Sequence, residues 1–590
     1  MDICAGRRKV QTATKNKLGQ IIQGEAAVEA SPALLAARPW IAHYEPGVPA
    51  EIAQESYSTL TDLWRRSREL YARRVALESF GVRLTYAQLG EAADAVTVWL
   101  QQNGFCKGDR AAIMSPNVMA YPAILLGVLQ AGGVVVNVNP LYTPRELEHQ
   151  ITDAEPRFLF VLENFATTVA AVADKFKLDR VILIAPGDLL GFKGALVNFV
   201  SRHIKKAVKP FALARTIAFA TVLRQGRSGK PTPVALTRDD TALLQYTGGT
   251  TGIAKGAILL HRNVAANIEQ NFAWFSPLLS PEEITISVTA LPLYHIFAMT
   301  ACFWFQVRVG GACLLIANPR DINGFVKTLQ KSHFNIINGV NTLFNALAEN
   351  PGLAKVDFSS VRFCLAGGMA TQSAVAKKWK ARTGKTIIEG YGLSETSPVL
   401  TINRADLAEF SGTIGYPTPS TEISIRDSLG QPVAPGKPGE ICARGPQVMA
   451  GYWNCPNETA VVMTSDGFLR TGDIGIMLPD GQVKIVDRLK DMIIVSGFNV
   501  YPNEVEDVLA EHPLVSEVAV IGRPNAAMGE EVVAVIVPRD PSLTVDELRR
   551  FCRERLTSYK VPREYVFREE LPKSNVGKVL RRNIKESLKG

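Results

Sequence analysis

Apolar residues along most of the chain fall into two alternating patterns. Short β-branched or apolar runs, suited to buried strands, stand at 111–116, 134–139, 157–162 and 180–185, and a helix-like apolar stretch fills 121–133. Strands that alternate with helices at this spacing favour βαβ units and parallel sheets. Since the alternation extends over roughly 400 residues, more than one sheet is needed to bury it.

The pattern changes in the last third of the chain. Between 412 and 484, short strands alternate with turn sequences such as GKPGE and PDGQ, which predict a small β-rich subdomain. After the charged segment RLKD at 488–491 comes a self-contained mixed pattern of about 100 residues, typical of a separate small domain.

We therefore predict an α/β fold with a large N-terminal domain and a small C-terminal one. The N-terminal domain, residues 36–489, is expected to hold two helix-flanked β-sheets plus the β-rich subdomain at 412–484. Residues 490–590 are expected to form a mobile α+β domain. Residues 1–35 are predicted to be poorly ordered.

Length and composition support this picture and exclude little. A chain of 590 residues is too long for one core, and 47% hydrophobic with 21% charged residues is ordinary for a globular protein. The net charge of +9 favours anionic partners, but no nucleic-acid-binding module is recognisable, so no nucleic acid partner is expected. The eight cysteines are scattered without a C-x-x-C pair, which argues for a reducing compartment such as the cytoplasm.

The segment 192–230 carries nine Lys or Arg and no acidic residue, with apolar residues near helical spacing between them. Two interpretations remain open. A basic amphipathic helix would suit peripheral contact with an anionic membrane on its inner face, whereas a solvated charged face over a local core is the alternative. The longest stretch without charge, 284–307, contains Pro292, Tyr294, His295 and Gln306, so buried strand, loop and helix are expected there instead of a membrane span.

The segment YTGGTTGIAKG at 246–256 is rich in glycine and threonine. Four glycines and three Thr hydroxyls make a loop with many donors that can wrap a polyphosphate, and a lysine adds a cation. The spacing excludes a Walker A loop, since Lys255 follows Ala254 and precedes Gly256. The candidate nucleotide-binding residues here are Tyr246, Thr247, Gly248, Gly249, Thr250, Thr251, Gly252 and Lys255.

This loop resembles the phosphate-binding signature of adenylate-forming enzymes, the group of acyl-CoA synthetases, luciferases and peptide-synthetase adenylation domains. The common form has Ser at the position of Gly248 and Pro at that of Ala254, and both departures are typical of bacterial long-chain fatty-acid–CoA ligases. The resemblance extends over about residues 40–588, with further motifs in the family order.

The resemblance assigns roles around the reacting groups. LPLYHIFA at 291–298 would place His295 beside the carboxylate, to stabilise it or to gate the pocket. Glu395 would bind Mg²⁺ with Thr247 beside it, because Mg²⁺ prefers a hard carboxylate plus phosphate oxygens. AGGMA at 366–370 and EGYGLSETSP at 389–398 resemble the adenine-binding strand ends, where Tyr391 would stack on the base. The adenine-site residues implied are Gly367, Gly368, Glu389, Gly390, Tyr391, Gly392 and Ser394.

Three later motifs complete the resemblance. In DGFLRTGDIGIMLPDGQVKIVDRLKD at 466–491, Asp473 would hold the ribose hydroxyls, Arg488 would assist and Lys490 would be the hinge. Gly497, in VSGFNVYPNEVE, would let the pantetheine of CoA pass, because any side chain would narrow the tunnel. Lys578, in LPKSNVGKVLRR, matches the lysine that catalyses adenylation by offsetting negative charge.

The resemblance implies an ATP-dependent enzyme that forms an acyl-adenylate from a long-chain fatty acid, releases pyrophosphate, and then passes the acyl group to CoA. Lys578, Glu395 and His295 are the expected catalytic residues, with ATP, Mg²⁺ and CoA required. GVNTLF at 339–344 resembles a pocket-lining segment, and a homodimer is a further expectation.

Three other functions compete with this one. A fatty acyl-AMP ligase would pass the adenylate to a carrier protein, but such enzymes carry an insertion near the hinge, and RLKDMIIVSGFNVYP runs without one. An aryl- or coumarate-type CoA ligase would have a smaller, more polar pocket. A non-catalytic homologue that binds fatty acid or membrane could have lost Lys578, Glu395 and Asp473, all of which are present.

Overall fold

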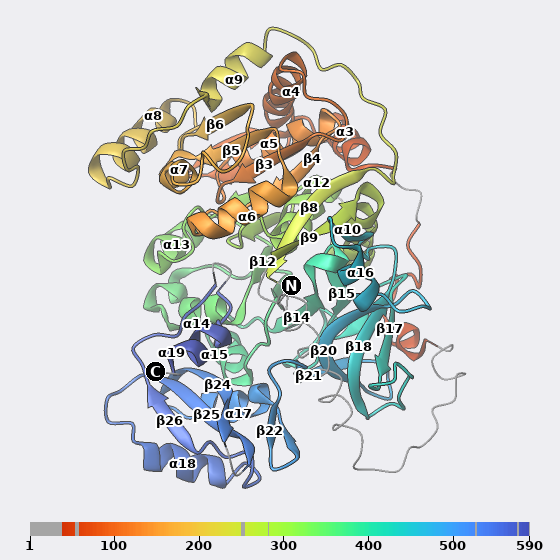
Figure 1. Ribbon diagram of the computed structural model, residues 1–590, viewed down its shortest axis with the longest axis vertical. Helices are drawn as coiled ribbons and strands as arrows, with labels where there is room; N and C mark the ends of the chain where they lie inside the picture. Colours follow the sequence, from red (N-terminus) through yellow and green to blue (C-terminus); the bar gives the residue numbers. More distant parts are fainter. Residues whose placement is uncertain are drawn as a thin grey trace.

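The structure, a computed structural model, describes residues 38–53, 58–248, 254–280, 283–525, 528–574 and 577–588. The predicted poorly ordered segment 1–35 lies outside these residues. The fold class is confirmed: a large α/β part with two big sheets is followed by a small antiparallel β-sheet and a separate C-terminal α+β part (Figure 1).

The first large sheet has nine strands in the order β16-β15-β14-β13-β12-β10-β11-β1-β2. Its centre is parallel, and antiparallel pairs close both edges. Its strands are β1 (Val75–Ser79), β2 (Val82–Thr85), β10 (Ile286–Thr289), β11 (Ala312–Leu315), β12 (Ile336–Gly339), β13 (Phe363–Gly367), β14 (Ile387–Gly392), β15 (Val399–Ile402) and β16 (Tyr416–Pro417).

The second large sheet has eight strands in the order β19-β9-β8-β4-β3-β5-β6-β7. It is parallel from β8 to β7, and the β8–β9 hairpin that bears the glycine-rich loop is antiparallel. Its strands are β3 (Arg110–Met114), β4 (Val134–Asn137), β5 (Phe158–Leu162), β6 (Arg180–Ile184), β7 (Thr216–Ala218), β8 (Thr241–Gly248), β9 (Ala254–Leu260) and β19 (Gly451–Tyr452).

Helices pack between the two large sheets and form one continuous core with them. The apolar stretch near 121–133 forms α5 (Ala120–Gln130), in which every residue except the last is buried, so its sequence has no polar face. The other main helices of this part are α3 (Leu60–Leu70), α4 (Tyr86–Gln102), α6 (Pro144–Ala154), α10 (His261–Phe275), α13 (Ile322–Leu329), α14 (Asn341–Glu349) and α15 (Ser373–Thr383).

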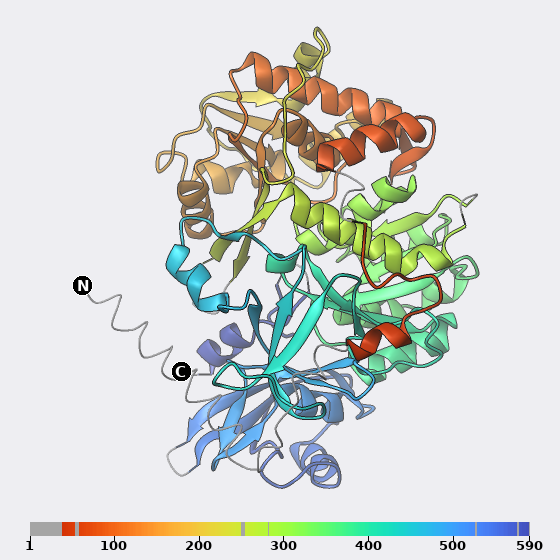
Figure 2. The ribbon, with the colours of Figure 1, turned by 90° about the vertical axis from the view of Figure 1, so that its right-hand side faces the viewer.

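The β-rich subdomain is a four-stranded antiparallel sheet of β17 (Glu422–Arg426), β18 (Pro438–Arg444), β20 (Leu469–Met477) and β21 (Val483–Arg488). It lies between the large sheets and the C-terminal part, which remains at the lower end of the molecule after a quarter turn (Figure 2). The subdomain is therefore next to both parts, so a ligand bound between the large sheets and the C-terminal part would lie close to it.

The C-terminal part has a sheet and cores of its own, as expected of a domain. The long β24–β25 hairpin is its centre, with β22–β23 and β26 added to β25. Its elements are β22 (Ile493–Val495), β23 (Phe498–Val500), α17 (Pro502–Ala510), β24 (Val515–Asn525), β25 (Gly529–Pro538), α18 (Val545–Arg553), β26 (Glu564–Phe567) and α19 (Arg581–Ser587).

The basic segment 192–230 is not one amphipathic helix. It contains α8 (Phe192–Phe199), a π-helical turn at Val200–Ile204, an irregular stretch, β7 and α9 (Phe219–Gly226). Pro210 accounts for part of the break, because it lacks an N–H and restricts the residue before it. Within the described part of the chain, no helix is both long enough and apolar enough to cross a membrane.

Candidate active site

A cleft of about 2070 Å³ lies where the large sheets, the β-rich subdomain and the C-terminal part meet. The C-terminal ends of β13 and β14 open into it, which is where open α/β sheets usually bind ligands. Lys578 comes from the far end of the chain and lines the same cleft as His295, Glu395 and Asp473. The structure thus brings together residues that are nearly 300 positions apart.

One wall of the cleft carries the Asp473 carboxylate, which two neighbouring side chains hold in place. The Tyr391 hydroxyl donates to Oδ2 of Asp473 at 2.8 Å, and Nε of Arg488 lies 3.1 Å from its Oδ1. Arg488 faces Asp473 because the two residues pair directly across β20 and β21. Burial raises the pKa of Tyr391 well above its usual value, and the Asp473 carboxylate raises the pKa of Arg488. The carboxylate is therefore fixed before any ligand arrives.

Glu440, on β18, supports this wall and was missed by the sequence analysis. Its buried carboxylate accepts a hydrogen bond from the Gly472 N–H at 3.1 Å and pairs with Nη2 of Arg470 at 2.7 Å. It thereby holds the backbone next to Asp473. Only the cross-strand register places it there, and nothing in its local sequence marks it as part of a site.

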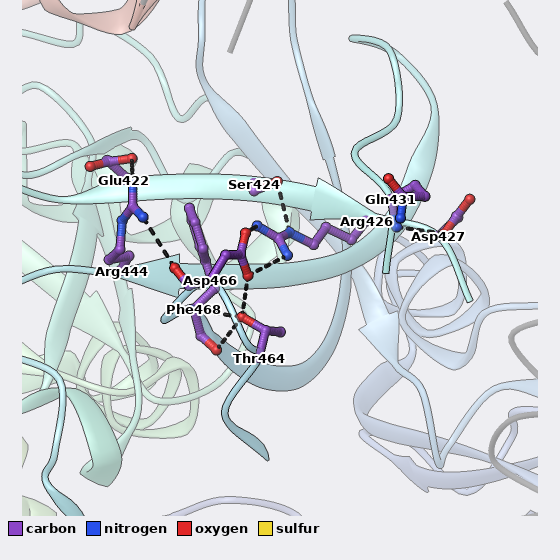
Figure 3. A network of polar contacts seen from close by, with 9 residues as sticks. All are labelled: Glu422, Ser424, Arg426, Asp427, Gln431, Arg444, Thr464, Asp466 and Phe468. Carbon is purple, nitrogen blue, oxygen red and sulfur yellow. Dashed lines mark hydrogen bonds and ion pairs between the residues drawn. The ribbon is translucent and has the colours of Figure 1, made fainter. Parts of the chain in front are cut away.

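The start of β20 is fixed by a second polar network (Figure 3). Arg426 makes two bonds to the Asp466 carboxylate, at 3.0 and 2.6 Å, and those bonds hold the pKa of Asp466 far below its usual range. The Phe468 ring lies 4.3 Å from the guanidinium of Arg426 and 4.6 Å from that of Arg444. The predicted 466–491 signature is thus anchored at its first residues as well as at Asp473.

The glycines predicted to line an adenine site lie at the ends of β13 and β14. A Cβ on Gly367 would meet the Gly390 carbonyl oxygen at 3.0 Å, and Gly368 has a φ of +79°, so both positions favour glycine. Glu389 lies beside them with its carboxylate accepting from the Thr371 N–H at 2.9 Å. Burial raises the pKa of Glu389 to about 7. All the predicted adenine-site residues line the cleft.

Glu395 lies in the short 3-10 turn Ser394–Thr396, and its side chain is almost buried. The Tyr452 hydroxyl donates to its Oε1 at 2.6 Å. Thr247, near the end of β8, lines the same cleft. No group of three or more His, Cys, Asp or Glu able to hold a metal occurs among the described residues. One carboxylate beside a phosphate site fits Mg²⁺, which keeps waters and takes phosphate oxygens as its other ligands.

The base of the glycine-rich loop is well defined by the β8–β9 hairpin. The Tyr246 hydroxyl donates to Oδ2 of Asp153 on α6 at 2.5 Å, so the hydroxyl is used to anchor the hairpin. Nζ of Lys255 lies 3.1 Å from Oε2 of Glu458. The predicted residues Gly249, Thr250, Thr251 and Gly252 lie outside the described residues.

His295 lies in the loop after β10 and caps the helix that follows. Its Nδ1 accepts from the Phe297 N–H at 3.3 Å, which leaves Nε2 as the protonated nitrogen of a neutral ring. Burial first, and then the nearby positive charge of Lys578, lower the pKa of His295 to about 3. In this arrangement His295 is a hydrogen-bond donor and a poor base at neutral pH.

Lys578 reaches the cleft from the C-terminal tail. Its Cε lies 3.4 Å from the position that a Cβ on Gly368 would occupy. Its pKa is lowered to about 8, mainly by burial and then by the positive charge of Arg488, whereas Asp473 and Glu395 act in the opposite direction. The Thr342 hydroxyl donates to the Gly577 carbonyl oxygen at 3.1 Å, which ties the tail to the predicted pocket segment 339–344.

The two remaining predicted residues lie at different places. Lys490 lines the cleft, and burial is the main cause of its lowered pKa. Gly497 does not line it. It lies exposed in the β22–β23 turn with a φ of +85°, and no heavy atom lies within 4 Å of its Cβ position. The structure brings Lys578 to the cleft and leaves Gly497 outside.

Comparisons with known proteins agree with this geometry. Residues 64–453 match the family model of the AMP-binding enzyme, and residues 504–578 match that of the AMP-binding enzyme C-terminal domain. This chain belongs to the AMP-binding enzyme family. In this AMP-binding enzyme the first matched region contains Glu395 and the second ends at Lys578, whereas Asp473 and Arg488 lie between the two.

Curated relatives match this AMP-binding enzyme over nearly their whole length. A long-chain-fatty-acid–CoA ligase of Yersinia pestis is 51% identical, with 93% of this chain and 97% of the relative covered. One of Escherichia coli O157:H7 is 49% identical, with 93% and 98% covered. The crystal structure of ATP-bound MatB from Rhodopseudomonas palustris has a TM-score of 0.77 at 28% identity, covering 90% of this chain and 99% of that one.

Proposed function

We propose that this AMP-binding enzyme is a long-chain fatty-acid–CoA ligase. It activates the fatty acid with ATP to an acyl-adenylate, releases pyrophosphate, and transfers the acyl group to CoA with release of AMP. The identity with curated long-chain-fatty-acid–CoA ligases supports the reaction. The observation that carries the proposal is the convergence of Lys578, Glu395 and Asp473 on one cleft.

In the first half-reaction the fatty carboxylate attacks the α-phosphorus of ATP, and pyrophosphate leaves. Asp473 accepts hydrogen bonds from the ribose hydroxyls. Tyr391 and Arg488 keep its carboxylate in the orientation that these bonds need. Lys578, protonated at neutral pH, stabilises the negative charge that develops between carboxylate and α-phosphate. His295 donates a hydrogen bond from Nε2 to the carboxylate. Glu395 and Thr247 would hold Mg²⁺, whose chemistry here is to neutralise phosphate charge.

In the second half-reaction the C-terminal domain, residues 490–590, turns about Lys490. This movement withdraws Lys578 and brings the Gly497 turn to the cleft, where the missing side chain leaves room for pantetheine. The exposed position of Gly497 in the present arrangement supports such a movement. The CoA thiol then attacks the acyl carbonyl, and AMP leaves.

Peripheral contact with an anionic membrane through 192–230 is a further part of the proposal. Phe192, Leu196, Phe199 and Ile204 are large apolar side chains with more than half of their surface exposed. Lysines at 193, 205, 206 and 209 flank them, and charge of this sign suits anionic headgroups. Co-sedimentation with vesicles containing anionic lipid tests the contact: Phe192→Ser with Leu196→Ser should abolish it, whereas retained binding would contradict it. A homodimer is expected from the family and is tested by light scattering.

The function is tested by measuring pyrophosphate release with ATP, Mg²⁺ and a ladder of saturated fatty acids, with and without CoA, together with the acyl-CoA formed. Thioester formation that peaks at long chains is the expected result. Adenylate without thioester would instead identify a carrier-protein ligase. No reaction with any acid would leave a non-catalytic binding protein.

A further inference from the structure

Four side chains from four separate elements form an unbroken series of contacts at the base of the glycine-rich loop. Glu458 on α16 (Pro456–Val462) pairs with Nζ of Lys255 on β9 at 3.1 Å. The same ammonium lies 4.7 Å from the centroid of the Tyr452 ring, and the Tyr452 hydroxyl donates to Glu395 at 2.6 Å. Tyr452 is the shared member, because its ring contacts the cation and its hydroxyl contacts the acid.

The backbone around Tyr452 is bound on both sides, so its side chain has little freedom. β19 pairs with β9, with Tyr452 opposite Ala257. The Met449 N–H donates to the Glu395 carbonyl oxygen at 2.8 Å, and the Tyr452 N–H donates to the Thr459 hydroxyl at 2.8 Å. Tyr452 is thus attached to the strand that follows the glycine-rich loop, to the turn that carries Glu395 and to the helix that carries Glu458.

We propose that Tyr452 is a positioning residue for binding of the ATP triphosphate. Its side chain holds Glu395 at its hydroxyl and the Lys255 ammonium on its ring face, so both groups stay at fixed places. The hydroxyl bond directs one oxygen of Glu395 toward Tyr452 and turns the other away from it. The ring face holds the Lys255 ammonium, an arrangement favoured electrostatically within about 6 Å. The proposal rests on the proposed function, since both held groups are those expected to contact phosphate and metal.

Glu458 completes the inference as the counter-ion of Lys255 when no nucleotide is bound. The Lys255 side chain is only 12% exposed, so an unpaired charge there would be costly. A triphosphate brings its own negative charge to the same ammonium and must displace Glu458 to pair with it. Tyr452 and Glu458 should therefore have opposite effects on nucleotide affinity.

The test measures binding of ATP with Mg²⁺ to the full chain by titration calorimetry, with neither fatty acid nor CoA present. Tyr452→Phe keeps the ring and removes only the hydroxyl; loss of a bond to a charged acceptor should weaken ATP binding roughly tenfold. Glu458→Gln keeps the shape of the side chain and removes its charge; it should tighten ATP binding about threefold. When Mg²⁺ is titrated at a fixed ATP concentration, the midpoint should lie at a higher Mg²⁺ concentration for Tyr452→Phe than for the wild type.

Two controls separate positioning from simple packing. Melting temperatures of both variants should fall by only a few degrees, since each variant loses one polar contact. Thioester formation from supplied acyl-AMP and CoA should be retained in Tyr452→Phe, because that step uses no triphosphate. Unchanged ATP affinity in Tyr452→Phe would overturn the proposal. Weakened affinity together with a lost thioester step would also overturn it in favour of a structural role. If Glu458→Gln weakens ATP binding, the counter-ion part is wrong. Because no acid substrate is present in the binding titrations, their results do not depend on which acid the enzyme prefers.

Discussion

The wall around Asp473, which we propose binds the ribose, and the C-terminal tail that carries Lys578 meet in the same cleft but are held there in different ways. Asp473 lies within one small sheet, and Tyr391, Arg488 and the Glu440-bound backbone fix it from several sides. The tail is docked across a domain boundary by contacts such as the Thr342–Gly577 hydrogen bond and an Arg539–Glu349 ion pair at 2.9 Å. The Asp473 wall is held within the main body of the cleft, whereas Lys578 is held by contacts that the proposed domain movement would break.

Under the proposed function, this difference suits the two regions to different steps. Both half-reactions need the nucleotide to stay bound, so the acid proposed to hold the ribose is best placed on the wall around Asp473. A group needed for adenylation alone can be delivered by a domain whose docking contacts are partly exposed and individually weak. Changes in the wall should therefore harm both half-reactions, whereas changes in the tail should harm only the first.

The largest expected effect is that of Lys578→Ala. Removing the charge that stabilises the transition state should lower adenylation roughly a hundredfold to a thousandfold, while supplied acyl-AMP and CoA still give thioester. Pyrophosphate release and a single-step thioester assay measure the two rates. Arg582→Ala is the matched control, since it removes a mostly exposed cation from the same tail. Adenylation at the wild-type rate in Lys578→Ala would refute the assigned role.

Asp473→Asn should weaken both half-reactions, in contrast to Lys578→Ala. The amide cannot accept from both Arg488 and the ribose as the carboxylate does, so KM for ATP should rise roughly tenfold to a hundredfold. Thioester formation from acyl-AMP should slow as well. Steady-state kinetics of each half-reaction give KM for ATP and the rate of thioester formation. A melting curve shows how much stability is lost because Arg488 has lost its carboxylate partner. A defect confined to adenylation would break the distinction between wall and tail.

The pH dependence of adenylation should reflect the environment of Lys578. Its pKa is lowered from 10.5 to about 8, and the protonated form is the active one, so activity should be present below pH 8 and fall as the pH rises through 8. Between pH 7 and pH 9 the fall should approach tenfold. Lys578→Arg should retain its charge and shift the descending limb to higher pH. The same limb in both proteins would assign it to another group.

The smallest effect is expected at the domain boundary. Arg539→Gln removes one of two cations paired with Glu349, the other being Lys378, and the Arg539 pair is more than one-third exposed, so adenylation should fall by only about twofold. Thioester formation should not fall, because that step needs the tail to leave. The ratio of the two rates is the sensitive measure. Equal losses in both steps would indicate a general loss of folded protein.

The sequence predicted the architecture well where periodicity and burial coincide. Uniformly apolar runs became β3, β4, β5 and α5, because elements covered on all sides carry no polar face. Of the two interpretations left open for the basic segment, a single amphipathic helix is not observed. Its first helical part ends at Ile204, since helical spacing of apolar residues does not overrule Pro210 and the left-handed backbone of Lys206.

The site was predictable where its residues lie in motifs, and not where a lone residue reaches it through the fold. The motifs that contain Asp473 and Lys578 could be recognised one by one in the sequence. Tyr452 and Glu440 could not be found, because their contacts with Glu395 and Gly472 depend on strand register and long-range packing. For Tyr452 the sequence offered only a weak signal, the GYW at 451–453, in which a glycine and an aromatic residue stand together at the start of a short strand.

The docking of the C-terminal domain through Arg539 and Glu349 also has a practical use. If that contact were made permanent, for example by a reducible bifunctional cross-link long enough to join cysteines introduced at the two positions, the domain would be locked in the arrangement that holds Lys578 in the cleft. Such an enzyme should release one burst of pyrophosphate, equal to the number of active molecules, and then stop with its adenylate trapped. Reduction would restart it. The burst would count working sites and hold the intermediate long enough to observe it directly.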